Sequence, residues 1–395
     1  MNKNILNTGV QNFINNNLDT DIMSVILKKS PFHNISSQEL AEQIQAKKKC
    51  EKKLPYWFST PLIYYPNKLN IEQCSSETTA KYKASILSGK TLVDLTGGLG
   101  VDTYFFSKKI EKVFHCEINQ NLSEIAAHNL GILGVGNIDF SSMDGMDFLE
   151  GSHQNFDWLY VDPSRRSESK GKVFMLSDCT PNIVEHLPLL FQKSKHILIK
   201  TSPLLDITIG LNELAHVKEI HVVALKNEVK ELLWVLEREY QGKTHIRTLN
   251  ITPPKPQRFS FNLTDEKDTL PSYELPQNYL YEPNVALLKA GAFKITSKAF
   301  RVHKLHEHSH LFTSKDLLEF PGRVFHIEDV IGYSKKELKP LIGTKANITV
   351  RNFPESVTTI RKKHKIKDGG EVYLFFTRLQ NNQLAVIKTS KVILQ

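Results

Sequence analysis

A glycine-rich turn after a short apolar run is the first part of the chain whose residue types could do chemistry. The run reads Thr91-Leu92-Val93-Asp94, and the turn that follows reads Leu95-Thr96-Gly97-Gly98-Leu99-Gly100. Glycines let the backbone approach a ligand closely, and the helix expected after the turn offers free N–H groups at its start. The turn therefore predicts a ligand site; the alternative is that the glycines serve only a tight turn.

Acidic residues follow the next two apolar runs at the same expected sheet edge. Glu117 ends the run at 112–117, and a carboxylate there can accept both hydrogen bonds of a ribose diol. Asp144 comes just after the run at 138–140, where an acid can accept a hydrogen bond from the amino group of adenine. The alternatives are a solvated strand end for Glu117, a helix cap for Asp144, and for Asp102 a cap or buttress of the helix after the turn. Together the acids and glycines predict a site for a nucleoside.

The fourth apolar run, at 158–162, ends in a motif suited to a reacting substrate. It reads Asp162-Pro163-Ser164-Arg165-Arg166 and falls at the carboxyl edge expected for a parallel sheet. The two arginines could hold a phosphate or the O6/N7 edge of a base through paired hydrogen bonds. The alternative for the arginines is a salt bridge inside the domain.

Alternating segments must position these residues. From about residue 75 helices alternate with short strands, which predicts an α/β fold with a parallel sheet covered by helices. The apolar runs at 219–225 and 231–236 are too close for a crossover helix, so they should form an antiparallel hairpin. A helix over 227–239 is the alternative. Residues 1–55 have helical periodicity.

The order of these motifs resembles that of a class I S-adenosylmethionine-dependent methyltransferase. The acidic glycine-rich turn, the acid after the second strand, Asp144 and Asp162-Pro163 occur in sequence, and the 219–236 hairpin matches the terminal strand pair of that family. The resemblance covers about residues 75–240 and implies a Rossmann-like, seven-stranded sheet that binds S-adenosylmethionine. The cofactor-binding residues that it implies are Asp94, Thr96, Gly97, Gly98, Gly100, Asp102, Glu117, Ile118, Asp144 and Gly145.

A closer resemblance covers most of the chain. The segments at 72–83 and 162–166, together with Arg351-Asn352-Phe353-Pro354, look like a little-characterised bacterial family. In that family a methyltransferase domain precedes a ferredoxin-like and a THUMP-like domain, and THUMP domains are associated with RNA-modifying enzymes, chiefly those acting on tRNA. We expect an N-terminal helical region at 1–74, a methyltransferase domain at 75–250, a linker at 251–278, a ferredoxin-like domain at 279–321 and a THUMP-like domain at 322–395.

The formal net charge of +9 is concentrated at one end of the chain. Residues 322–395 contain 14 Lys and Arg against 6 Asp and Glu, so they carry +8, and the rest of the chain carries +1. A basic module on a nearly neutral body favours a polyanion partner, with a merely solubilising surface as the alternative. Phe353 is either a base-stacking residue or part of the core. The residues expected to bind RNA are Arg166, Arg351, Asn352, Phe353, Arg361, Lys362 and Lys363.

Other features exclude several classes of protein. The four cysteines form no CxxC pair, which argues against a disulfide scaffold or zinc finger and fits a reducing cytoplasm. No apolar stretch is long enough for a membrane span, and the first residues lack the core of a signal peptide.

Alternating His306, His308 and His310 could share a strand face and bind zinc, but a polar or RNA-contacting edge is favoured and no metal is expected. Cys179 is interpreted as a buried residue rather than a nucleophile.

These observations predict a cytoplasmic S-adenosylmethionine-dependent methyltransferase that acts on a base nitrogen of tRNA or rRNA. Asp162 and the carbonyl of Pro163 would orient the target nitrogen, and Arg165 would hold the nucleotide. Amino-nitrogen methyltransferases commonly have a second proline and an aromatic residue where this chain has Ser164 and Arg165. The alternatives are aminocarboxypropyl transfer from the same cofactor, a non-catalytic RNA-binding protein that retains the fold, and a methyltransferase for protein or a small molecule.

Overall fold

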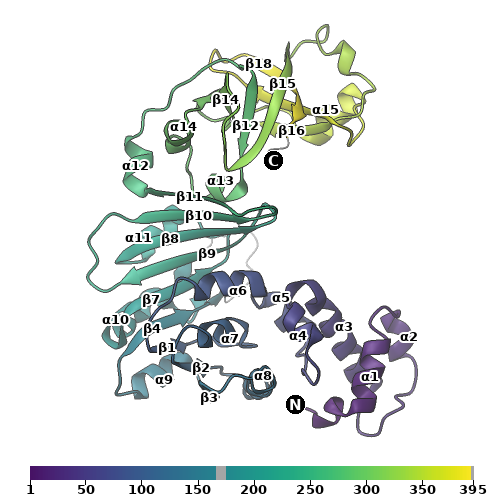
Figure 1. Ribbon diagram of the computed structural model, residues 1–395, viewed down its shortest axis with the longest axis vertical. Coiled ribbons are helices and arrows are strands. Elements are labelled where there is room, and N and C mark those ends of the chain that lie inside the picture. The colour runs from purple at the N-terminus through teal and green to yellow at the C-terminus, as the bar shows by residue number, and fades with distance from the viewer. Residues whose placement is uncertain (166–174, 393–395) are drawn as a thin grey trace. The chain divides into compact units, whose positions relative to one another are not determined.

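The computed structural model describes residues 1–165 and 175–392, and these divide into two compact units (Figure 1). The first unit comprises residues 1–217 and 234–240, and the second comprises 218–233 and 241–395. None of the described helices is both long and apolar enough to cross a bilayer.

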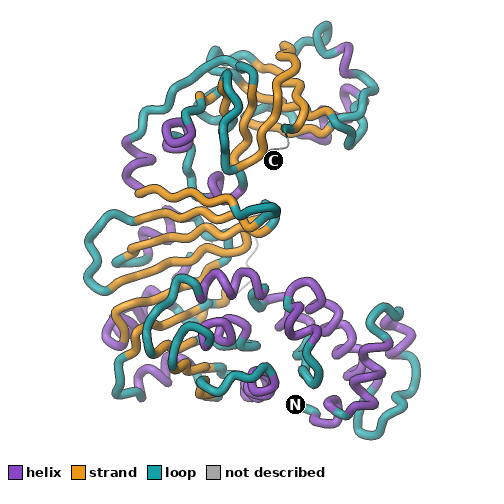
Figure 2. Tube along the Cα trace, viewed as in Figure 1, coloured by secondary structure: helices purple, strands orange, loops and turns teal. Residues whose placement is uncertain are grey.

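The first unit begins with helices only (Figure 2). Ser36 and Glu39 form a capping box at the start of the longest of them, because each side chain accepts from the backbone N–H of the other residue. Trp57, Cys50 and Ile63 share a buried cluster with Tyr104, so these helices pack onto the domain that follows. The N-terminal elements are η1 (Lys3–Leu6), α1 (Thr8–Asn16), α2 (Ile22–Ile26), α3 (Ser37–Lys53), α4 (Pro55–Ser59), α5 (Lys68–Gln73) and α6 (Glu77–Ala84).

A parallel sheet with intervening helices forms the centre of the first unit. Its strands β1, β2, β3, β4 and β7 pair in parallel, with β1 between β2 and β4. Their carboxyl ends therefore meet at one edge, as the sequence predicts. The elements are β1 (Thr91–Asp94), α7 (Val101–Ser107), β2 (Lys112–Cys116), α8 (Gln120–Ile132), β3 (Ile138–Ser141), α9 (Gly145–Gly151), β4 (Phe156–Val161), β5 (Ser164–Arg165), η2 (Leu176–Asp178), β6 (Cys179–Thr180), α10 (Ile183–Lys193), β7 (Ser194–Thr201) and α11 (Ile207–Glu213).

The expected hairpin is present. Strands β8 (Val217–Leu225) and β9 (Glu228–Glu237) are joined by Lys226 and Asn227, both of which have a positive φ, as a two-residue hairpin turn requires. The strand order is β11-β10-β8-β9-β7-β4-β1-β2-β3. The last seven positions of this order form the predicted class I methyltransferase sheet, and the helix alternative for 227–239 is wrong.

Two further strands extend that sheet to nine. β10 (His245–Ile251) pairs with β8 in parallel, and β11 (Gln257–Asn262) pairs with β10 antiparallel. The segment expected to be a linker, 251–278, thus contains β11 and the helix α12 (Leu263–Asp268). Its alternation of Phe259 and Phe261 with polar residues is a strand signal that lies among the prolines of this segment.

The second unit contains a separate seven-stranded sheet in the order β13-β14-β12-β15-β18-β17-β16. β15 pairs with β12 on one side and β18 on the other, so the segments 279–321 and 322–391 share one sheet. Between β15 and β16, residues 339–341 form the short 3₁₀ turn η3. The elements are β12 (Tyr279–Pro283), α13 (Val285–Lys289), α14 (Ile295–Phe300), β13 (His303–Lys304), β14 (Phe312–Ser314), β15 (Gly322–Gly332), η3 (Lys339–Leu341), β16 (Asn347–Arg351), α15 (Val357–His364), β17 (Val372–Arg378) and β18 (Leu384–Lys391).

Candidate active site

Asp94 shapes the glycine-rich turn from beneath. It is 1% exposed, and its Oδ1 accepts from the backbone N–H of Thr96 (3.1 Å), while Oδ2 accepts from the Thr103 hydroxyl (2.6 Å). Burial raises the pKa of Asp94 to about 7. The carboxyl group thus joins the turn to helix α7, and its contacts are internal to the domain.

The glycines allow the turn to lie directly on strand β2. A Cβ on Gly97 would fall 2.3 Å from Nε2 of His115, whose buried ring lies below the turn. Gly98 and Gly100 have φ values of +54° and +78°, which side chains rarely tolerate. The three glycines are therefore required by the close approach at Gly97 and by the backbone conformation at Gly98 and Gly100. A Cβ on Gly98 would meet only the carbonyl oxygen of Thr96, at 3.9 Å.

Glu117 closes the turn at the end of β2. Its Oε2 accepts from the N–H of Gly98 (2.9 Å) and its Oε1 accepts from the N–H of Asn119 (2.8 Å). The next residue, Ile118, is 72% exposed, and Met143 in the neighbouring loop is 43% exposed. This end of the sheet thus combines carboxylate acceptors with exposed apolar side chains that can cover a flat ring.

Asp144 and Gly145 lie at the start of α9, beside the end of β1. The Oδ1 atom of Asp144 accepts from the N–H of Met146 (2.7 Å), which makes Asp144 the N-cap of α9. Gly145 is buried, and a Cβ there would fall 2.3 Å from the carbonyl oxygen of Leu95. These contacts support the capping interpretation of Asp144 and give Gly145 a packing role; their predicted contacts with the cofactor stay predictions.

Asp102 belongs to a buried polar network. Its Oδ2 accepts from the hydroxyls of Ser75 and Tyr160, both at 2.8 Å, and its Oδ1 lies 3.3 Å from Nζ of Lys83. The Lys83 side chain is fully buried. Lys83 lies in α6, Ser75 just before it and Tyr160 in β4, so the carboxylate ties these elements to α7, as the buttressing alternative anticipated.

Asp162, after β4, has a carboxylate that is paired with a lysine at the edge of the sheet. Its backbone N–H donates to the Thr96 hydroxyl (2.8 Å), so the motif after β4 is bound directly to the glycine-rich turn. Its carboxylate forms an ion pair through Oδ2 with Lys200 at the end of β7. In the described part of the chain, Oδ1 makes no further hydrogen bond. Lys200 was not anticipated from the sequence; a lysine that closes an apolar strand beside an Asp-Pro strand was the available signal.

The remainder of the motif is only partly described. Pro163 is buried and Ser164 is exposed, with its hydroxyl 3.5 Å from the carbonyl oxygen of Thr180. The backbone of Arg165 pairs with Cys179 across the short β5–β6 ladder. The Arg165 side chain and Arg166 lie outside the described residues, so their predicted roles stay predictions. Cys179 itself is buried.

Most of the residues predicted to bind RNA have partners within the second unit. Arg351 donates to Glu282 (2.9 Å), Arg361 pairs with Asp368 (2.5 Å), and Lys363 pairs with Glu355 (2.8 Å). Phe353 packs edge-on against Tyr333 and Phe376, which supports its core alternative. Asn352 hydrogen-bonds the ring of His306, and Lys362 is exposed.

The histidines do not form the strand face considered from the sequence. β13 ends at Lys304, so His306, His308 and His310 lie in a turn instead. His310 stacks on Phe293, with ring centroids 3.7 Å apart. Over residues 1–165 and 175–392, no group of three His, Cys, Asp or Glu side chains has a metal-binding arrangement.

Comparisons with known proteins agree with this architecture. Residues 279–321 match a family model described as a ferredoxin-like domain, and residues 322–391 match one described as THUMP domain-like. The crystal structure of a proposed methyltransferase from Porphyromonas gingivalis is 31% identical and covers 99% of both chains, with a TM-score of 0.89. Uncharacterised S-adenosylmethionine-dependent methyltransferases from two strains of Mycobacterium tuberculosis are 20% identical over 80% of this chain and 85% of their own length.

Proposed function

Since this chain belongs to the family of class I S-adenosylmethionine-dependent methyltransferases with ferredoxin-like and THUMP-like C-terminal domains, we propose that its substrate is RNA and that a base nitrogen accepts the methyl group. The THUMP-like match and the charge of +8 over residues 322–395 support RNA as the substrate class. The finer proposal is tRNA or rRNA. The observation that carries the reaction type is the Asp162–Lys200 pair beside the glycine-rich turn.

The residues at the sheet edge fit S-adenosylmethionine. Glu117 provides carboxylate oxygens for the ribose hydroxyls, and Asp144 provides one for the adenine amino group. Ile118 and Met143 are apolar side chains that remain exposed beside these acids, so they can cover the two faces of an adenine ring. When bound, the cofactor supplies an electrophilic methyl group on a sulfonium.

Asp162 and Lys200 supply complementary groups for the acceptor base. Lys200 engages Oδ2 of Asp162 and so fixes the carboxylate, while Oδ1 can accept from an N–H on the target nitrogen. The Lys200 ammonium can donate to the ring nitrogen or oxygen next to that position. This arrangement matches a base edge with adjacent donor and acceptor atoms and would orient the target nitrogen for methyl transfer. The Thr96 hydroxyl keeps this motif beside the cofactor turn.

Labelled-methyl transfer tests this proposal. Purified protein is incubated with methyl-labelled cofactor and total RNA or total protein from a strain that lacks it, and the labelled RNA is digested for nucleoside mass spectrometry. Label in a methylated nucleoside of tRNA or rRNA is expected, and it should be lost in Asp162→Asn. Label in protein or small molecules with an unlabelled RNA pool would refute the RNA proposal, and a mass gain larger than methyl would favour aminocarboxypropyl transfer.

A further inference from the structure

A group of exposed lysines in the second unit has no acidic partner. They lie between the end of β15 and the turn before β17, and within the described residues none of them forms an ion pair. We call this group the lysine surface. Its members are Lys335, Lys336, Lys339, Lys345, Lys362, Lys365 and Lys367.

Two chain segments bring members of the lysine surface together. The N–H of Lys367 donates to the carbonyl of Thr344 (2.8 Å), and the N–H of Ala346 donates to the carbonyl of Lys367 (3.0 Å). The N–H of Gly343 also donates to the carbonyl of His364 (3.3 Å). The segments 343–346 and 364–367 therefore run side by side, which places Lys345, Lys365 and Lys367 on one small stretch of backbone pairing.

Two nearby acids pair with other basic residues, and the remaining two, Glu337 and Glu371, are outnumbered by the seven lysines. Asp368 pairs with Arg361, and Glu355 pairs with Lys363 and accepts from the Tyr333 hydroxyl. Glu337 accepts from the Ser334 hydroxyl at 2.7 Å. After the internal ion pairs have formed, the lysine surface therefore keeps a net positive charge. This charge can attract an external polyanion.

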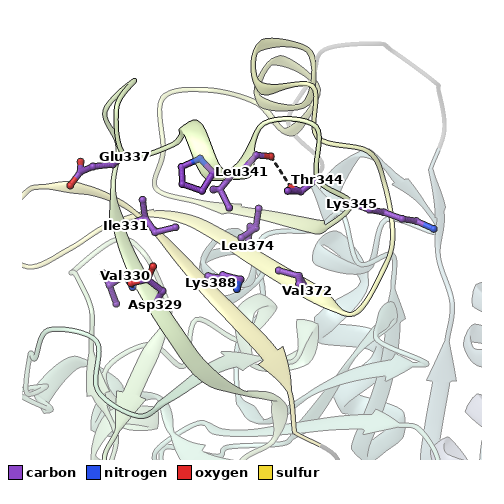
Figure 3. Close-up of a pocket in the computed structure, with 11 residues that line it drawn as sticks. Asp329, Val330, Ile331, Glu337, Leu341, Thr344, Lys345, Val372, Leu374 and Lys388 are labelled. Atoms are coloured by element: carbon purple, nitrogen blue, oxygen red, sulfur yellow. Dashed lines mark hydrogen bonds between the residues drawn. The ribbon is translucent and has the colours of Figure 1, made fainter.

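Lys345 lies at the edge of a hollow in the second unit. The hollow has a volume of about 580 Å³, and its wall includes the apolar side chains of Ile331, Leu341 and Leu374. Figure 3 shows the Lys345 side chain extending away from this hollow. The Thr344 hydroxyl turns back to the carbonyl of Leu341 (2.7 Å) and fixes the loop that carries Lys345. The ammonium group therefore stays in solvent on a positioned loop.

We propose that the lysine surface binds the phosphate backbone of the RNA substrate. This inference rests on the proposed function, and it assigns RNA capture to residues that differ from most of those predicted from the sequence. Arg351, Arg361 and Lys363 are held in internal ion pairs, whereas the members of the lysine surface present flexible ammonium groups, which suit phosphate contacts without base specificity. Binding through them is expected to be strongly salt-dependent and tolerant of sequence.

A charge-matched pair of triple variants tests the assignment. The test variant replaces Lys345, Lys365 and Lys367 by Gln, and the control replaces Lys267, Lys298 and Lys315, which are also exposed lysines of the second unit without ion pairs among the described residues. Binding of fluorescently labelled bulk tRNA is followed by anisotropy over a series of salt concentrations. The test variant should reduce the slope of log K against log salt by about 2 to 3, and the control should leave it near wild type.

Equal slopes for the test variant and wild type, or equal losses in test and control variants, would overturn the assignment. Thermal midpoints matching wild type confirm that both triple variants remain folded. The wild-type methyl-transfer assay separates this proposal from the one on which it rests. If wild type labels RNA while the test variant binds tRNA with an unchanged slope, only the lysine surface is refuted. If wild type neither binds nor labels RNA, the proposed function itself fails.

Discussion

The carboxylate of Asp162 is joined to the ammonium group of Lys200 by strand register. Val161 and Ile199 are direct partners in the parallel β4–β7 ladder, so Asp162 and Lys200, which follow them, lie at the same level along the two chains. The resulting ion pair is partly buried: the Asp162 side chain is 33% exposed and the Lys200 side chain is 14% exposed. A rigid sheet, rather than a loop, therefore sets the geometry of the two groups proposed to meet the acceptor base.

Asp162→Asn should abolish most of the methyl transfer while leaving the cofactor site intact. The substitution keeps the backbone N–H that donates to Thr96 but removes the anionic acceptor, so we expect the rate to fall by about 10²- to 10⁴-fold. Calorimetric titration with S-adenosylhomocysteine should give a dissociation constant close to that of wild type. Asp147→Asn, at an exposed acid of α9, is the control. Full activity in Asp162→Asn would remove Asp162 from the mechanism.

Lys200→Gln should lower kcat by about a hundredfold, because it removes both the donor proposed for the base edge and the charge that fixes Asp162. Lys200→Arg keeps the charge and should recover part of the rate. Lys195→Gln is a matched control on the same strand, where Lys195 forms an exposed ion pair with Glu237. Steady-state measurements of kcat and of KM for RNA and for the cofactor test this prediction. A loss confined to KM for the cofactor, or equal losses in Lys200→Gln and Lys195→Gln, would argue against a role at the acceptor base.

Glu117→Gln should weaken binding of S-adenosylhomocysteine. The carboxylate holds the N–H groups of Gly98 and Asn119 and is the proposed acceptor for the ribose hydroxyls. An amide presents a single acceptor oxygen and no charge, so a loss of about 1.5–3 kcal/mol is expected, or roughly 10- to 100-fold in the dissociation constant. Titration calorimetry measures this loss, with Glu150→Gln on the exposed end of α9 as the control. Affinity equal to that of the control would contradict the ribose assignment.

The sequence was sufficient for features that depend on local pattern. The strand–turn–helix around Gly97, the Asp-Pro strand end and the 219–236 hairpin all follow from periodicity and turn chemistry. Ion pairs between residues far apart in the sequence could not be predicted from local pattern. Lys200 lies 38 residues from Asp162, and Arg351 lies 69 residues from Glu282, so only the folded sheets show which charges meet. The basic residues predicted to bind RNA were chosen without knowledge of those carboxylates.

His115 should make stability depend on pH through its position beneath Gly97. Burial lowers the pKa of His115 from 6.5 to about 4, so between these values the unfolded chain binds a proton that the folded chain does not. The free energy of unfolding should therefore fall as the pH is lowered from 6.5 to 4, by about 3 kcal/mol at most from this group. His115→Phe lacks this contribution. Asp94, whose raised pKa has the opposite effect, is present in both proteins. Urea unfolding over this range should show wild type losing stability relative to the variant, and a pH-independent difference would show that His115 remains protonatable in the folded state.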